Sequence, residues 1–217
     1  MNQTLSKTLS DLFGKEVVLF VCIVAVGALV LAVVPMWIFW EEWLGFMVSY
    51  LHWIPWEWLQ TTGASIAAFA LGYMVFIVLI NLFTSLFSET LLIRLAKKHY
   101  PDTPVTGEAS IAASIAVNAK ASVIFLILFI LFIPLLFVPV LGQIAMLYLW
   151  SVLIKEPTVY EVGSLFIKDR RIRKEKSKKA RTIALIASLF NYIPVVNIFA
   201  PIFAQILFLH HILRSDT

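Results

Sequence analysis

Long apolar stretches, separated by short charged connections, dominate the chain. Four stretches contain no Asp, Glu, Lys or Arg, and they cover residues 17–40, 58–88, 121–154 and 182–213. A helix needs about 20 predominantly apolar residues to cross the hydrocarbon core of a bilayer. Each stretch is long enough for at least one crossing, so the pattern predicts an all-α integral membrane protein.

Prolines interrupt the third and fourth apolar stretches. Pro134 and Pro139 lie within the third, and Pro194 and Pro201 lie within the fourth. Proline breaks or kinks a helix because it lacks the backbone donor and clashes with the preceding turn. Each stretch is therefore either one kinked spanning helix or a re-entrant hairpin that turns inside the bilayer and leaves on the side where it entered.

The distribution of Lys and Arg favours the re-entrant hairpins. Lys and Arg near membrane segments collect on the cytoplasmic side. The connection 155–181 carries ten Lys or Arg and four Asp or Glu, whereas the connection 41–57 carries three Glu and no Lys or Arg. A single crossing by the third stretch would place the ten cations outside. The charge pattern therefore predicts two long transmembrane helices plus two Pro-broken, hemi-penetrating helical hairpins, with both termini cytoplasmic.

This layout forms a single membrane domain over residues 1–217. Its expected parts are transmembrane helix 1 at 16–40, an interfacial Trp-rich segment at 41–58, transmembrane helix 2 at 61–98, hairpin 1 at 120–154, a basic cytoplasmic connection at 155–181 and hairpin 2 at 182–213.

The composition agrees with a membrane protein and argues against an enzyme. Hydrophobic residues make up 61% of the chain and charged residues only 14%, whereas soluble domains carry about 25% charged residues. No nucleotide loop, metalloprotease motif or Ser/His/Asp set stands out. The four histidines (His52, His99, His210 and His211) are not at ligand spacing with carboxylates, so we expect no metal site, no cofactor and no catalysis.

The charged residues indicate how the protein meets its surroundings. The run 168–181 is strongly basic and lies next to a membrane segment, so we expect it to attract anionic lipid rather than nucleic acid. The spans hold no Lys, Arg, Asp or Glu of the kind that proton-coupled carriers place near the bilayer centre. This absence favours a passive pathway over ion-coupled pumping.

Amide side chains are the candidate groups of such a pathway. Gln143 and Gln205 each lie four residues after a proline, at matching places in the two interrupted stretches. Glutamine is costly in hydrocarbon without a partner, and paired, interrupted hydrophobic segments are a pointer to a transport site. Asn191 and Asn197 add two further amides in the fourth stretch.

The stretch from Ile193 to Pro201, with Pro194 and Asn197, resembles the I-P-x-x-N-x-x-x-P signature of the CysZ sulfate permease family. This family is the bacterial branch of the etoposide-induced membrane protein superfamily. The resemblance implies the same two helices and two hairpins, assembly into homo-oligomers, and sulfate uptake for cysteine synthesis across the bacterial inner membrane.

The family also places a Gly-Leu-Arg element before its first span to hold sulfate. The nearest residues here are Phe13-Gly14-Lys15-Glu16. Gly14 and Lys15 are the candidates for the access site, although the leucine of the family element is missing and Glu16 follows.

The function expected from the sequence is a passive or weakly coupled anion permease or channel for sulfate. Asn197, Asn191, Gln205 and Gln143 would line the pathway, and Pro134, Pro139, Pro194 and Pro201 would shape the hairpin tips. The alternative is a non-transporting protein of the same superfamily that scaffolds or remodels the membrane.

Overall fold

The computed structural model describes residues 2–52, 55–136, 138–193 and 195–214. These residues form helices and no strand, which confirms the all-α prediction. Three helices among the described residues are long and apolar enough to cross a membrane, or four if the bent pair α4–α5 is one span. The chain is therefore an all-α membrane protein.

The chain divides into two compact units. Unit 1 contains Met1–Val21 and Thr84–Thr217, and unit 2 contains Cys22–Phe83. Helices α2 (Lys15–Ile38) and α4 (Glu57–Phe87) begin or end in unit 1, but most of each belongs to unit 2.

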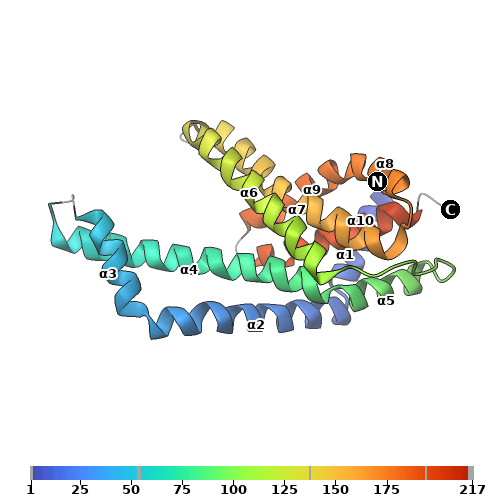
Figure 1. Cartoon of the computed structure of the whole chain (residues 1–217), viewed down its shortest axis with the longest axis horizontal. Coiled ribbons are helices and arrows are strands. Elements are labelled where there is room, and N and C mark those ends of the chain that lie inside the picture. Colours follow the sequence, from blue (N-terminus) through green and yellow to red (C-terminus); the bar gives the residue numbers. More distant parts are fainter. Residues whose placement is uncertain (1, 53–54, 137, 194, 215–217) are drawn as a thin grey trace. The chain divides into compact units, whose positions relative to one another are not determined.

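Unit 2 consists of the long parts of α2 and α4, which lie side by side, and the short helix α3 (Trp40–Leu51) between them in the chain (Figure 1). Small residues of α4 permit the close approach of α2. Ala64 and Ala68 are buried, and a Cβ on Gly72 would lie 2.6 Å from the sulfur of Met36 on α2. Small residues in one stripe allow this kind of helix contact in membranes.

The helix expected at 61–98 is two helices in the structure. The segments Val75–Phe87 and Glu89–His99 are bent by 58°, and α5 (Glu89–His99) starts after the buried residue Ser88. Helix α5 is amphipathic: its leucines are buried, while its cations Arg94, Lys97 and Lys98 follow on other faces. The amphipathic helix α5 buries its apolar face inside unit 1. Helix α4 is instead apolar over most of its surface, so the two helices suit different surroundings.

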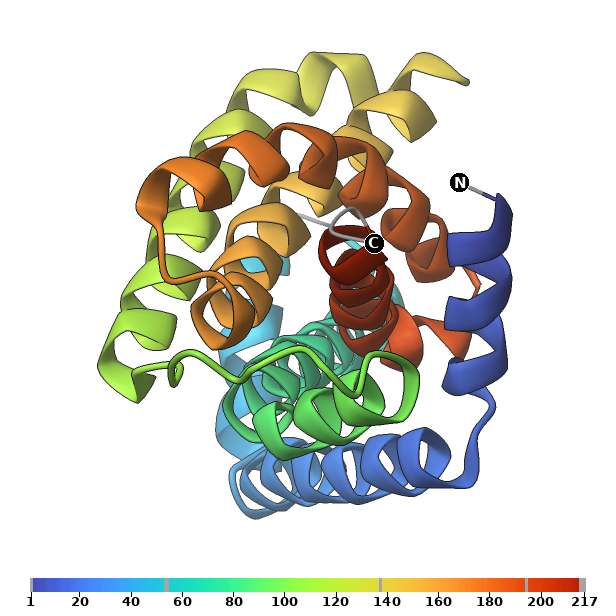
Figure 2. The same ribbon diagram turned by 90° about the vertical axis from the view of Figure 1, so that its right-hand side faces the viewer.

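Helix α10 (Ala200–Arg214) lies at the centre of unit 1. Figure 2 shows it surrounded by α1 (Asn2–Leu12), α5, α7 (Leu141–Phe166) and α9 (Ala180–Ser188). Every residue of α10 except His211 and Arg214 is buried. A helix that is apolar nearly all round in this way is a core helix.

Two helical hairpins complete unit 1. Helices α6 (Ile111–Leu136) and α7 pack side by side (Figure 1), with Phe125 and Trp150 at a ring-centroid distance of 5.9 Å. The second hairpin runs from α9 through the 3-10 turns η2 (Leu189–Tyr192) and η3 (Val196–Phe199) into α10, and Phe190 stacks on Phe203 at 4.4 Å. Between the hairpins lie α8 (Arg170–Lys176) and η1 (Ser177–Lys179).

The first hairpin is longer than the charge-free stretch from which it was predicted. Its arms cover Ile111–Leu136 and Leu141–Phe166 rather than 120–154, because an exposed residue such as Lys120 does not end a helix. That either hairpin enters and leaves the membrane on one side stays a prediction.

Both hairpin tips contain a valine in a strained backbone conformation. Val140 has φ 69° and ψ −54°, and Val195 has φ 70° and ψ −43°. The N–H of Leu141 donates to the carbonyl of Pro139 at 2.8 Å, so Val140 is the centre of a γ-turn, a rare and strained form. Positive φ is a genuine outlier for a β-branched residue.

The four prolines occupy different positions relative to these tips. Pro139 lies in the turn itself, Pro134 lies inside the end of α6, and Pro201 lies in the first turn of α10. In a first helical turn proline has no intrahelical donor to lose, so Pro201 fits α10 without breaking it. Pro194 lies outside the described residues.

Replacing Val140 by glycine should stabilise the protein. Relief of backbone strain gains about 1–3 kcal/mol, and the extra entropy of glycine in the unfolded chain costs about 0.5–1 kcal/mol. The Val140 side chain is 69% exposed, so little packing is lost. We expect Val140→Gly to raise the melting temperature of the detergent-solubilised protein.

The matched control is Val138→Gly, two residues earlier in the same turn, where φ is negative. This control should lower the melting temperature. Equal destabilisation by both substitutions would rule out strain at Val140.

Candidate functional site

A basic pocket lies in unit 1 where α1 passes into α2. The pocket has a volume of about 470 Å³ and is lined by Asp11, Gly14, Lys15, Glu16, Val17, Arg94, Leu95, Lys97 and Lys98. The two residues expected at an access site, Gly14 and Lys15, both line it. Helix α5 supplies the opposite wall.

The turn at Gly14 has no room for a side chain. The N–H of Gly14 donates to the carbonyl of Asp11 at 2.9 Å, and the Gly14 carbonyl accepts from the N–H groups of Val17 and Val18 in the first turn of α2. A Cβ on Gly14 would lie 2.9 Å from the Asp11 carbonyl oxygen, a backbone atom that cannot move aside cheaply. Glycine is therefore required for this junction.

The pocket is electrostatically suited to a small anion. Four cations line it (Lys15, Arg94, Lys97 and Lys98), against the two acids Asp11 and Glu16. The first turn of α2 also forms part of the wall, and a helix start carries unpaired amides and partial positive charge. The combination of cations and a helix start is typical of sites that bind anions.

The three cations of α5 were not identified from the sequence as site residues, because a positive connection is explained by membrane topology alone. Their spacing was the available signal. Arg94, Lys97 and Lys98 stand three and four residues apart, and residues at this spacing are neighbours on a helix surface.

A second polar cluster surrounds the buried carboxyl group of Glu161 on α7. Ser85, at the end of α4, donates its hydroxyl to Oε1 of Glu161, and Gln205 of α10 donates its amide to Oε2. Asn118 of α6 donates to the Ser85 hydroxyl at 3.2 Å. Glu161 is 3% exposed. Residues from four helices (α4, α6, α7 and α10) therefore take part in one buried cluster.

Burial is the dominant influence on this carboxyl group. It raises the pKa of Glu161 to about 7, although the hydrogen bonds from Ser85, Gln205 and Asn118 act in the opposite direction. Glu161 lies outside the helices that qualify as membrane spans. Near neutral pH the group therefore exists in both protonation states.

Glu161 was missed because the sequence places it inside the connection 155–181, among ten cations. The signal that could have found it is local: Glu161 is the one charged residue between Glu156 and Lys168, in a stretch rich in apolar residues. A lone acid in such a stretch is buried with partners or carries a function.

The predicted pathway amides differ in how deeply they are buried. Gln205 is 2% exposed and Asn197 is 5% exposed, whereas Asn191 is half-buried in η2 and Gln143 is exposed in the first turn of α7. The Tyr192 hydroxyl donates to the backbone carbonyl of Gln143. The two glutamines thus differ in environment, and of the four amides Gln205 is the one that joins the Glu161 cluster.

A third cluster, the Asp11 cluster, joins α1, α5 and α10. His99 and His210 each place Nε2 2.9 Å from a carboxylate oxygen of Asp11, and the Lys98 ammonium group lies 3.2 Å from Oδ1. The hydroxyl of Tyr100 lies 3.2 Å from Nδ1 of His210. Burial by itself raises the pKa of Asp11, but hydrogen bonds from His210, His99 and Lys98 outweigh it and hold that pKa well below its usual range.

The structure corrects the sequence-based interpretation of the histidines. The sequence showed no histidine at ligand spacing with a carboxylate, yet His99 and His210 both contact Asp11. The sequence separations of 88 and 199 residues explain the error, because no local pattern reveals such a contact.

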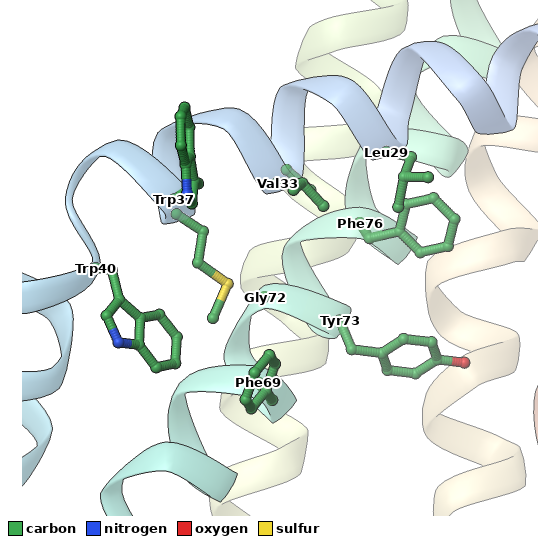
Figure 3. Close-up of a pocket in the computed structure, with 10 residues that line it drawn as sticks. Leu29, Val33, Trp37, Trp40, Phe69, Gly72, Tyr73 and Phe76 are labelled. Atoms are coloured by element: carbon green, nitrogen blue, oxygen red, sulfur yellow. The ribbon is translucent and has the colours of Figure 1, made fainter.

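An apolar cavity in unit 2 does not suit an anion. It has a volume of about 570 Å³ and is walled by aliphatic and aromatic side chains (Figure 3), which are Leu29, Ala32, Val33, Met36, Trp37, Trp40, Phe69, Gly72, Tyr73 and Phe76. None of these carries a charge, so an anion would lose its hydration without an ionic partner. The basic pocket is therefore the better candidate.

Comparison with known proteins identifies one relationship. The family model described as "Sulfate transporter CysZ/Etoposide-induced protein 2.4" matches residues 4–201. The match includes the basic pocket and Glu161, but it ends before Gln205 and His210. No curated protein and no solved structure matches the chain.

Replacing Glu161 by glutamine should change how stability depends on pH. The folded protein holds Glu161 protonated up to about pH 7, whereas the ordinary value is 4.5. Stability from this group is therefore fully present below about pH 4.5 and is lost as pH rises through 7. We expect the melting temperature of the wild type to fall between pH 5 and 8, and that of Glu161→Gln to fall less.

A glutamine at position 161 can keep the local hydrogen bonds. Its new amide group can donate to Oε1 of Gln205, which is buried and has no hydrogen-bond partner among the described residues. The matched control is Glu156→Gln on the same helix, where the side chain is 53% exposed. The control should retain the wild-type pH profile. An unchanged profile in Glu161→Gln would contradict the assignment.

Proposed function

The chain belongs to the sulfate transporter CysZ/etoposide-induced protein 2.4 family, and from this premise we propose that it is a passive or weakly coupled sulfate permease of the bacterial inner membrane. The observation that carries the proposal is the basic pocket. A sulfate transporter must first collect a doubly charged anion from water. The pocket joins cations from α2 and α5 to a helix start at Gly14.

In this proposal the pocket acts as the access site. Lys15 and Arg94 provide charge-assisted hydrogen bonds to sulfate oxygens, which are stronger than bonds between neutral groups. Both side chains border a space of about 470 Å³, which is ample for one sulfate ion with some of its water. Asp11 lines the same space, but its carboxylate is engaged by His99, His210 and Lys98.

Beyond the pocket, the proposed pathway uses amides of the hairpins. Gln205 and Asn197 are buried in unit 1, while Asn191 and Gln143 lie near the hairpin tips. Amide groups can donate hydrogen bonds to an anion without trapping it by charge. None of these four side chains carries a charge, which supports passage of the anion rather than tight binding.

The position of the chain in the membrane is part of the proposal. Arg214 donates to the hydroxyl of Thr4 at 3.3 Å, which supports both termini lying on one side. The distribution of Lys and Arg favours the cytoplasm as that side. The exposed cations Lys168, Arg171 and Lys174 would meet anionic lipid there. Assembly into homo-oligomers, as the family resemblance implies, would complete the pathway between subunits or within one.

Sulfate uptake into proteoliposomes tests the proposal. The double variant Lys15→Gln/Arg94→Gln should raise the KM for sulfate at least tenfold, because each lost charge-assisted hydrogen bond is worth about 1.5–3 kcal/mol. Chloride and phosphate serve as competitors. The matched control is Lys168→Gln, which removes an exposed cation of unit 1 outside the pocket and should leave KM unchanged.

The same assay separates the permease from the scaffold. Asn197→Ala should reduce the maximal uptake rate without affecting insertion. No uptake above empty liposomes, in wild-type protein shown to be folded and inserted, would favour the non-transporting scaffold. Uptake with the wild-type KM in the double variant would remove the basic pocket from the mechanism.

The backbone at Gly14 provides an independent test. Gly14→Ala would place a methyl group 2.9 Å from the Asp11 carbonyl oxygen, so the α1–α2 junction must shift and sulfate affinity should fall. Gly45→Ala is the control, because nothing lies within 4 Å of its Cβ position. It should leave uptake unchanged, and equal effects of the two substitutions would refute a special role for Gly14.

A further inference from the structure

The Asp11 cluster has the composition and geometry of a metal site. One carboxylate and two imidazoles come from three different helices, and their ligand atoms all lie within 4.8 Å of one another. Four ligands at the usual bond lengths around a tetrahedral zinc ion stand about 3.3 Å apart. The distances of 2.9 Å between Asp11 and each Nε2 need only a small expansion to admit an ion.

The surroundings of His210 match those of a ligating histidine. A metal-bound imidazole ordinarily has its second ring nitrogen fixed by a hydrogen-bond partner. Here Nδ1 of His210 faces the Tyr100 hydroxyl at 3.2 Å, which leaves Nε2 for the ligand position. His210 is fully buried and Asp11 is 2% exposed, so two of the three ligands are held rigidly by the core.

An ion could also reach the cluster. The side chain of His99 is 22% exposed, so one of the three ligands is open to water. The ammonium group of Lys98 competes for the carboxylate at 3.2 Å, but its side chain is 64% exposed. It can turn into water when an ion takes its place.

From these contacts we propose that Asp11, His99 and His210 bind a divalent transition-metal ion of the zinc type. Imidazole with one carboxylate suits Zn²⁺, Co²⁺ or Ni²⁺ and not the all-oxygen sites of Ca²⁺ or Mg²⁺. The ion would join α1 to α5 and α10, and three protein ligands leave a fourth position for water. The metal site shares Asp11 and Lys98 with the wall of the basic pocket, but its test measures metal binding and not sulfate uptake.

The test is Co²⁺ titration of the full chain in detergent, after removal of any affinity tag and of bound metal with a chelator. Co²⁺ held by two imidazoles and a carboxylate gives visible absorption bands. We expect saturation at one ion per chain, displacement of Co²⁺ by Zn²⁺, and a melting temperature that rises with Zn²⁺ concentration.

The decisive variant is His99→Gln. The glutamine amide can still donate to Asp11, so the fold is kept, but the imidazole ligand is lost. We expect at least a hundredfold weaker Co²⁺ binding and no stabilisation by Zn²⁺. His52→Ala, which removes an exposed histidine outside the cluster, should bind Co²⁺ as the wild type does.

Lys98→Gln supplies a variant with the opposite expectation. Removing the competing ammonium group should tighten Co²⁺ binding severalfold. The proposal is overturned if the wild type binds no more Co²⁺ than His99→Gln, if His52→Ala loses the signal, or if Lys98→Gln weakens binding. In those cases the cluster is a hydrogen-bonded junction without a metal.

Discussion

The burial of α10 is the constraint on which the rest of unit 1 depends. The helix is enclosed by α1, α5, α7 and α9, yet it carries two polar side chains, Gln205 and His210, that are almost fully buried. Buried polar groups in proteins are hydrogen-bonded, because an unpaired one costs its full desolvation energy. Each of these two side chains is therefore matched by an acid from a neighbouring helix.

The two acids occupy comparable positions but behave differently. Glu161 meets neutral donors only, so burial raises its pKa to about 7, while Asp11 meets cationic or protonatable donors that hold its pKa below the usual range. Both residues are only 2–3% exposed, and their carboxyl groups differ in the charge of their partners. One core helix thus contacts two buried acids with opposite pKa shifts, through side chains five residues apart in its sequence.

Part of this arrangement could be predicted from the sequence. The long helices followed from charge-free stretches and the turn containing Pro139 from its prolines. The family resemblance pointed to Gly14 and Lys15, which line one pocket, while their role in binding sulfate stays a prediction. The kink at Ser88 and the partners of Glu161 and Asp11 could not be predicted, because tertiary packing decides them. The matching positions of Gln143 and Gln205 in the sequence paired Pro139 with Pro201. In the structure the two hairpin tips correspond at Val140 and Val195, which share a positive φ, and no sequence pattern reveals a dihedral angle.

The contact between Asp11 and His210 also bears on how the protein is made. The two residues are 199 positions apart, so α1 leaves the ribosome long before its partner helix exists. Until α10 has been synthesised, the amphipathic helix α1 can contact α5 through Asp11 but lacks its partner helix α10. It can rest its apolar face on the lipid headgroups meanwhile, as such helices do. Membrane insertion of α2 and α4 can be complete by then, and the closing of unit 1 becomes the last step of biogenesis.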